Sequence, residues 1–273
     1  MNKHKLSFGI IFCYLIMAIV LIISLYPILW ILLSSFKERP GGLGFPDKWI
    51  FTGYVTIFTK LNILSYFANS IIVTLGSTVF SVLVVTLAAY VCARMEFKLK
   101  GLVTLMFAST LFIPQYAISF PLYRLINNLN LYDTRMGLMF VYMGLNIAIS
   151  FFIVKSYFTS IPKEMNEAAE LDGCSYSRTF FTIMMPLAKP SISTALVMTF
   201  LNNWNEFYFA SLLLQSKSKM TIPALLGQFT TAYSMNLNGM FSAIIISIIP
   251  TIVVFCCFSE LFVKSLTDGA VKG

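Results

Sequence analysis

Long stretches without a charged residue constrain this sequence more than any other feature. Residues 6–36 hold no Asp, Glu, Lys or Arg, and the same is true of 71–93, 101–123 and 136–154. The hydrocarbon core of a bilayer is about 30 Å thick, which about 20 helical residues cross at about 1.5 Å each. Each stretch is therefore long enough for a membrane-spanning helix.

Two late apolar segments raise the expected number of spans to six. The expected helices are 8–34, 68–93, 102–125, 137–159, 190–214 and 240–262. The apolar runs are continuous and lack the alternation of a barrel strand, which favours helices. The expected fold class is all-α, a polytopic membrane protein with six transmembrane helices. The first run exceeds the apolar region of a signal peptide, so we expect a retained helix.

Composition and charge agree with a membrane protein. Hydrophobic residues make up 58% of the chain and charged residues only 11%, too little charge to cover a soluble domain. The net charge of +8 is spread over the loops and does not indicate nucleic acid. If Lys3 and Lys5 lie inside, eleven of the nineteen Lys and Arg do so, a modest bias of the expected sign. Both termini are then expected on the cytoplasmic side.

Several kinds of chemistry are missing from the sequence. The only histidine is His4, no glycine is followed by lysine, and the five cysteines have no metal-ligand spacing. Histidine-based catalysis, a phosphate-binding G-x-x-x-x-G-K-[ST] loop and a metal site are thereby excluded. We expect no enzyme and no cofactor in this chain. Ion-coupled carriers bury ionisable residues, and Glu206 is the only clear candidate within a predicted span.

The polar segment 155–190 separates the fourth and fifth predicted spans. Pro162 suits an early helical position, and Glu164 and Glu167 suit the positive end of the helix dipole. Gly173 can take a left-handed conformation and end the helix. The small residues Ala168 and Ala169 would let a partner approach closely. The residues alone leave two interpretations open, a docking helix for a partner and an amphipathic helix lying on lipid.

The same segment resembles the EAA loop of binding-protein-dependent ABC importer permeases. The resemblance rests on Glu167-Ala168-Ala169, Asp172-Gly173, Ile183 and Pro186, whereas Cys174 and Met185 depart mildly from the family pattern. Further stretches resemble the carbohydrate-uptake branch: Asn69-Ser70, Ala88-Ala89-Tyr90 with Arg94, residues 160–164, Trp204-Asn205-Glu206-Phe207 and Leu266–Gly273. The last of these is similar to the tail of the maltose-type second permease.

The resemblance implies a type I importer permease with three parts. Residues 1–65 would hold the first transmembrane helix and an external loop. Residues 66–264 would form the ABC transmembrane type-1 core with the cytoplasmic EAA loop 155–190. Residues 265–273 would form a cytoplasmic tail.

The resemblance also implies a function, sugar import by alternating access with energy from a separate ATPase. Glu167 would face that ATPase, Ala168 and Ala169 would allow close packing, Gly173 would make the turn, and Asp172 would cap or pair locally. The implied partners are two ATPase subunits that bind ATP and magnesium, a second permease in a heterodimer, an extracellular solute-binding protein and the lipid of a bacterial cytoplasmic membrane. A permease for another solute such as a polyamine, or an ion-coupled carrier, stays as an alternative.

A polar cluster in the fifth predicted span is the candidate translocation path. Glu206 lies well inside the span, where a charge needs a cavity or a polar partner. Asn202 and Asn205 lie beside it, and Gln115 follows Pro114 in the third span, where a kink is expected. These side chains could hydrogen-bond a sugar. A structural polar cluster between helices is the competing interpretation.

Overall fold

The computed structural model describes residues 8–38, 42, 44–229 and 237–270, and it gives side-chain surroundings as far as residue 258. Every regular element in these residues is helical, which confirms the predicted fold class. Along the chain the elements are α1 (Phe8–Ser34), α2 (Thr52–Thr59), α3 (Ile63–Arg94), α4 (Lys100–Ser109), η1 (Gln115–Ile118), α5 (Ser119–Asn128), α6 (Arg135–Leu145), α7 (Ile147–Ser160), α8 (Glu164–Leu171), α9 (Tyr176–Thr179), η2 (Phe180–Met184), α10 (Met185–Leu187), α11 (Lys189–Trp204), α12 (Tyr208–Leu213), α13 (Ile222–Gln228) and α14 (Leu237–Ala270).

Three of the described helices are long and apolar enough to cross a bilayer unbroken. They are Gly9–Ser34, Ile63–Arg94 and Leu237–Phe258. Two bent pairs bring the number to five if each pair is one span: α6 with α7 at 49°, and Tyr176–Leu187 with α11 at 76°. The remaining predicted helix, 102–125, begins as the short apolar helix α4.

Three of the predicted helices are wrong in their continuity. The expected helix 137–159 is bent by 49° at Asn146, between α6 and α7. The expected helix 102–125 is interrupted after Ser109, because Pro114 holds an extended conformation (ψ 120°) before η1 and α5 begin. Pro121 does not break α5, since it lies in its first turn, where no intrahelical N–H bond is needed. The expected helix 190–214 stops at Trp204 and resumes as α12 at Tyr208.

The ends of the chain fall partly outside the described residues. The lysines at positions 3 and 5 and the last three residues of the predicted tail 265–273 lie there. Helix α14 continues without interruption through 265–270, beyond the expected end of the sixth helix at 262.

The described residues within 1–63 and 228–247 form one compact unit, called unit 1. Phe36 lies at the centre of an aromatic cluster, with its ring 5.3 Å from those of Trp49 and Phe51 and 5.2 Å from that of Tyr54. The expected external loop 37–65 therefore contains ordered structure, including α2. A Cβ on Gly53 of α2 would lie 2.5 Å from the Ser242 hydroxyl of α14, so only glycine permits this close approach.

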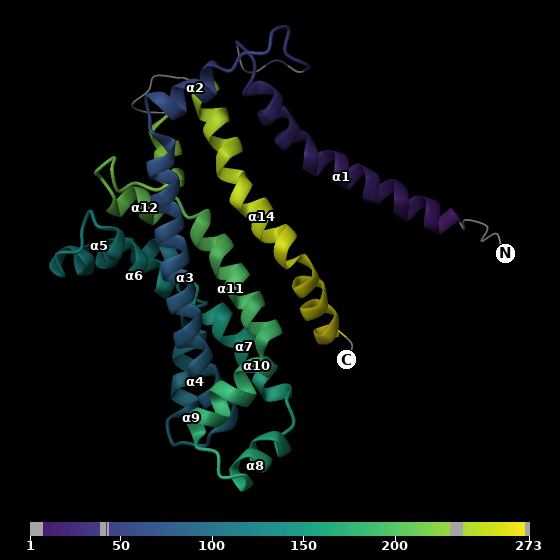
Figure 1. Ribbon diagram of the computed structural model, residues 1–273, viewed down its shortest axis with the longest axis vertical. Coiled ribbons are helices and arrows are strands. Elements are labelled where there is room, and N and C mark those ends of the chain that lie inside the picture. Colours follow the sequence, from purple (N-terminus) through teal and green to yellow (C-terminus); the bar gives the residue numbers. More distant parts are fainter. Residues whose placement is uncertain (1–7, 39–41, 43, 230–236, 271–273) are drawn as a thin grey trace. The chain divides into compact units, whose positions relative to one another are not determined.

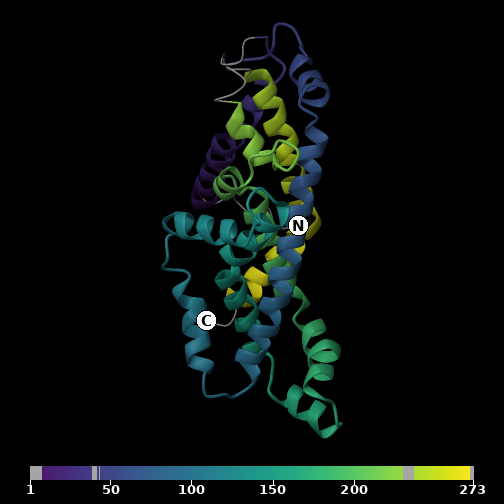
Figure 2. The same cartoon turned by 90° about the vertical axis from the view of Figure 1, so that its left-hand side faces the viewer.

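The described residues within 64–227 and 248–273 form the second compact unit, called unit 2. Its apolar core is built where α3, α7, α11 and η2 meet, around residues such as Val85, Phe151, Phe158, Phe180 and Ala195. In both views of the unit, α8 and α9 lie together at one end of α3, and α5 and α12 lie toward its other end (Figures 1 and 2). The segment between α7 and α11 thus forms one extremity of unit 2.

Candidate functional site

Helix α8 is a short polar helix that protrudes at one end of unit 2 (Figure 1). The chain leaves α7 at Ile161, which is extended (φ −70°, ψ 137°), and enters α8 at Glu164. The expected first-turn carboxylates Glu164 and Glu167 are present, where they favour the helix dipole. No side chain caps this end by a hydrogen bond.

Gly173 ends α8 as the sequence predicts. Its φ is +75°, a left-handed conformation that glycine adopts without steric cost. The Cys174 amide donates to the Ala169 carbonyl at 2.9 Å, and the Gly173 amide donates to the Glu170 carbonyl at 3.0 Å. These two bonds are those of a Schellman motif, which satisfies the last carbonyls and reverses the chain.

The faces of α8 divide the predicted coupling residues into two groups. Glu167, Ala168 and Asp172 are exposed, whereas Ala169 is 3% exposed and packs within its own chain. Leu171 is 90% exposed, which is unusual for a large apolar side chain on a polar helix. Sequence reasoning missed Leu171, although its place between Glu170 and Asp172 on a short polar helix was a usable signal.

Glu206 lies two residues before helix α12, and the structure gives its carboxylate protein partners. One oxygen accepts from the Phe209 amide at 2.8 Å, and the other accepts from the Ala210 amide at 3.0 Å. The Tyr142 hydroxyl of α6 donates to the second oxygen at 2.9 Å. The carboxylate thus satisfies N–H groups that the start of a helix leaves unpaired.

A chain of amides links α3, α7 and α11 beside this break. Buried Asn203 donates to the hydroxyls of Ser77 at 3.0 Å and Thr78 at 3.4 Å. Asn146 donates to Asn203 at 2.9 Å and accepts from Asn202 at 2.8 Å. Asn203 is therefore the centre of the network, and predicted Asn202 lies at its exposed edge.

Predicted Asn205 is exposed, and its amide donates to the Leu201 carbonyl of α11 at 2.8 Å. The second break contributes the last predicted path residue, Gln115. Gln115 is exposed, and its amide donates to the Leu145 carbonyl at 3.3 Å. Its neighbour Tyr116 is 64% exposed and meets Tyr208, 39% exposed, edge to face at 4.9 Å between ring centroids. The structure thus brings residues from the breaks at 110–114 and 205–207 together. Non-helical backbone within a span is tolerated only inside protein or along a water-filled cavity.

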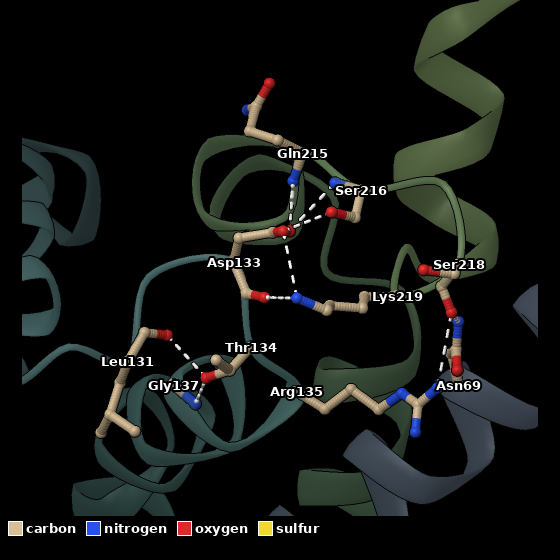
Figure 3. A network of polar contacts seen from close by, with 10 residues as sticks. All are labelled: Asn69, Leu131, Asp133, Thr134, Arg135, Gly137, Gln215, Ser216, Ser218 and Lys219. Carbon is tan, nitrogen blue, oxygen red and sulfur yellow. Dashed lines mark hydrogen bonds and ion pairs between the residues drawn. The ribbon is translucent and has the colours of Figure 1, made fainter.

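An ion-pair network in unit 2 joins the segment before the start of α6 to the loop that follows α12 (Figure 3). Asp133 accepts from the amides of Gln215 and Ser216, both at 2.9 Å, from the Ser216 hydroxyl, and from Lys219 at 3.2 Å. Burial raises the pKa of Asp133, but these hydrogen bonds outweigh burial and hold that pKa well below its usual range.

The neighbouring loop residue Ser218 extends this network to α3. Its carbonyl accepts from Asn69 at 2.9 Å and from Arg135 at 3.4 Å, and both side chains point toward it in Figure 3. The loop 214–221 is thus tied to both α3 and the start of α6.

Helices that break within hydrophobic segments, together with a polar helix presented at one extremity, are typical of a polytopic membrane transport subunit. The model of the family described as "Binding-protein-dependent transport system inner membrane component" matches residues 85–268. The chain is 34% identical to the probable ABC transporter permease protein YurM of Bacillus subtilis, over 99% of this chain and 91% of the relative. It is 32% identical to the trehalose/maltose transport system permease protein MalG of Thermococcus litoralis, over 92% and 93%.

A solved structure shares the fold. It belongs to a bacterial ABC transporter involved in the import of the polysaccharide alginate, with a TM-score of 0.83 at 22% identity over 95% of this chain and 98% of the other. The chain belongs to the family of binding-protein-dependent transport system inner membrane components. It is therefore a membrane-embedded, non-catalytic permease subunit of an ABC importer.

Proposed function

We propose that this permease translocates a carbohydrate by alternating access, with α8 as the helix through which a separate ATPase drives it. The observation that carries the proposal is the form of α8 itself. It is a short helix held to its own chain on one face and exposed on the other, and a glycine turn fixes its end. Such a helix can be displaced as a unit by a partner.

The proposed partners follow from the family and from this geometry. Two ATPase subunits would bind ATP and magnesium and would contact Glu167, Ala168 and Leu171, which are exposed on α8. A second permease would complete a heterodimer, and an extracellular solute-binding protein would deliver the substrate. A solved relative contains a periplasmic protein of this kind bound to an alginate pentasaccharide. The chain would lie in a bacterial cytoplasmic membrane with both termini on the cytoplasmic side.

A carbohydrate substrate is supported by the names of relatives and by the residues at the breaks. One relative is the diacetylchitobiose uptake permease NgcG of Streptomyces coelicolor, 30% identical over 92% of this chain and 85% of the relative. Tyr116 and Tyr208 present aromatic rings, whose negative faces attract the C–H groups of a sugar ring. Gln115, Asn202 and Asn205 add amides that can bond to hydroxyls.

Reconstitution separates this proposal from its alternatives. The permease pair is placed in liposomes with and without the ATPase subunits, and uptake of labelled maltose, trehalose, diacetylchitobiose and the polyamine spermidine is measured. We expect uptake of at least one sugar, only with ATPase, ATP and binding protein present. Uptake without the ATPase would indicate an ion-coupled carrier, and uptake of spermidine alone would indicate another solute class.

The orientation of α8 is tested separately by thiol labelling. In a variant whose other cysteines are replaced by alanine, Cys174 at the end of α8 should react with a membrane-impermeant maleimide only from the cytoplasmic side. Reaction from the outside would refute the coupling role of α8.

A further inference from the structure

Tyr90, near the end of α3, contacts several parts of the α7–α11 connection. Its side chain is 3% exposed. Its ring lies 5.5 Å from that of Phe158 in α7 and 5.0 Å from that of Phe180 in η2. Its hydroxyl accepts a hydrogen bond from the Asn166 amide of α8 at 3.2 Å. One side chain thus contacts α7, α8 and η2.

Arg94 makes a second connection one turn further along α3. Its guanidinium donates to the Ile161 carbonyl at 2.5 Å. Ile161 is the extended residue that joins α7 to the start of α8. The Arg94 bond therefore fixes the entry to α8, while Tyr90 fixes its middle through Asn166.

We infer that Tyr90 and Arg94 are positioning residues that transmit displacement of α8 into α3. This inference rests on the proposed function of α8. Helix α3 runs without a break from Ile63 to Arg94, and about 20 Å along it from Tyr90 lies Ser77, the partner of Asn203 in the network beside the break of α11. The contacts form a continuous physical route from α8 to that break.

The hydrogen bonds at this joint are incomplete. Asn166 Oδ1 and Arg94 Nε are buried and have no hydrogen-bond partner in the described part of the chain. Buried polar groups are nearly always paired in a stable arrangement. The unpaired acceptor and the unpaired donor at this contact are consistent with side chains that exchange hydrogen-bond partners between two states of a transport cycle.

The test removes the Tyr90 hydroxyl and keeps its ring. Tyr90→Phe is placed in the full complex with the second permease, ATPase subunits and binding protein in liposomes, with the sugar that the wild type imports as substrate. Sugar uptake and ATP hydrolysis are measured on the same sample. We expect ATP hydrolysis to continue and the ratio of uptake to hydrolysis to fall about fivefold, the equivalent of about 1 kcal/mol.

The matched control is Tyr157→Phe. Tyr157 packs against the same core, and no hydroxyl bond of its side chain is seen in the described residues, so its ratio should stay at the wild-type value. Asn166→Leu should lower the ratio of uptake to hydrolysis as much as Tyr90→Phe does. The double variant should lower it no further, because the two substitutions remove the same hydrogen bond. Arg94→Met should also lower the ratio, and Arg94→Lys should lower it less, because lysine keeps a donor for the Ile161 carbonyl.

Two results would overturn the inference. One is that both uptake and ATP hydrolysis stay at their wild-type rates in Tyr90→Phe. The other is an equal fall of uptake and hydrolysis in Tyr90→Phe, which indicates a merely structural role. Failure of the proposed function looks different, since the wild-type complex itself would then show no ATP-dependent sugar uptake.

Discussion

Glu206→Gln should destabilise the protein without changing which sugar it carries. The carboxylate accepts three hydrogen bonds, from the amides of Phe209 and Ala210 and from the Tyr142 hydroxyl. A glutamine keeps one acceptor oxygen and turns an NH₂ group toward the remaining donor, so at least one bond is lost. Hydrogen bonds to a charged group contribute about 1.5–3 kcal/mol. Loss of the negative charge at the start of α12 adds about 0.3–1 kcal/mol.

The expected cost is therefore about 2–4 kcal/mol, centred on α12. Thermal unfolding of the purified complex, followed by size-exclusion chromatography after heating, should show a transition several degrees lower. Glu38→Gln, at an exposed carboxylate in the described residues, serves as the control and should leave the transition unchanged. Tyr142→Phe should destabilise in the same direction, and the double variant should cost less than the sum. Unchanged stability with an altered sugar preference would refute the structural role and assign the carboxylate to the substrate.

Three further outcomes are expected. Gly173→Val should cost at least about 1–2 kcal/mol of stability and lower uptake per ATP, because valine strains the left-handed backbone at this position; the cost is not a clash, since a Cβ there would meet no atom within 4 Å. Gly173→Asn should retain more coupling, and wild-type uptake by the valine variant would contradict the role of this turn. Leu171→Ala should weaken association with the ATPase in pull-down experiments, whereas Leu99→Ala, 60% exposed, should not. Asp133→Asn should lower stability at pH 7, and the difference in stability between the variant and the wild type should shrink below about pH 4. A carboxyl group whose pKa is depressed in the folded state stabilises the fold above its unfolded pKa, and this stabilisation is lost as the pH falls toward the folded pKa. A stability difference that does not depend on pH would contradict this.

Features that depend on neighbouring residues alone could be predicted from the sequence. Charge-free runs located the main apolar helices because each residue carries its own cost of transfer into lipid. The turn at Gly173 was equally local, since a glycine after an eight-residue amphipathic helix has few alternative uses. The first predicted helix, 8–34, coincides with α1.

The breaks and the networks needed the folded chain. No proline or glycine marks the break at 205–207, and the carboxylate inside an apolar run left two interpretations open, a sugar ligand and a structural polar cluster. Its main partners include Tyr142, 64 residues away in the sequence. Asp133 was not singled out at all, because Ser216 and Lys219 lie more than 80 residues further along the chain. Periodicity and composition do not record such pairs.

Helix α3 and its neighbours in unit 2 differ in continuity, and this suits them to different parts in a conformational change. Helix α3 is a single continuous helix of 32 residues, whereas the chain breaks between α4 and α5 and between α11 and α12. A continuous helix transmits a displacement along its length, whereas a helix bundle changes shape with least loss of packing where its helices are interrupted. The side chains suited to a sugar, Tyr116 and Tyr208, lie at those breaks and not on α3. A displacement of α8 would therefore be transmitted through the continuous helix α3, and the bundle would change shape at the breaks, where the proposed substrate path lies.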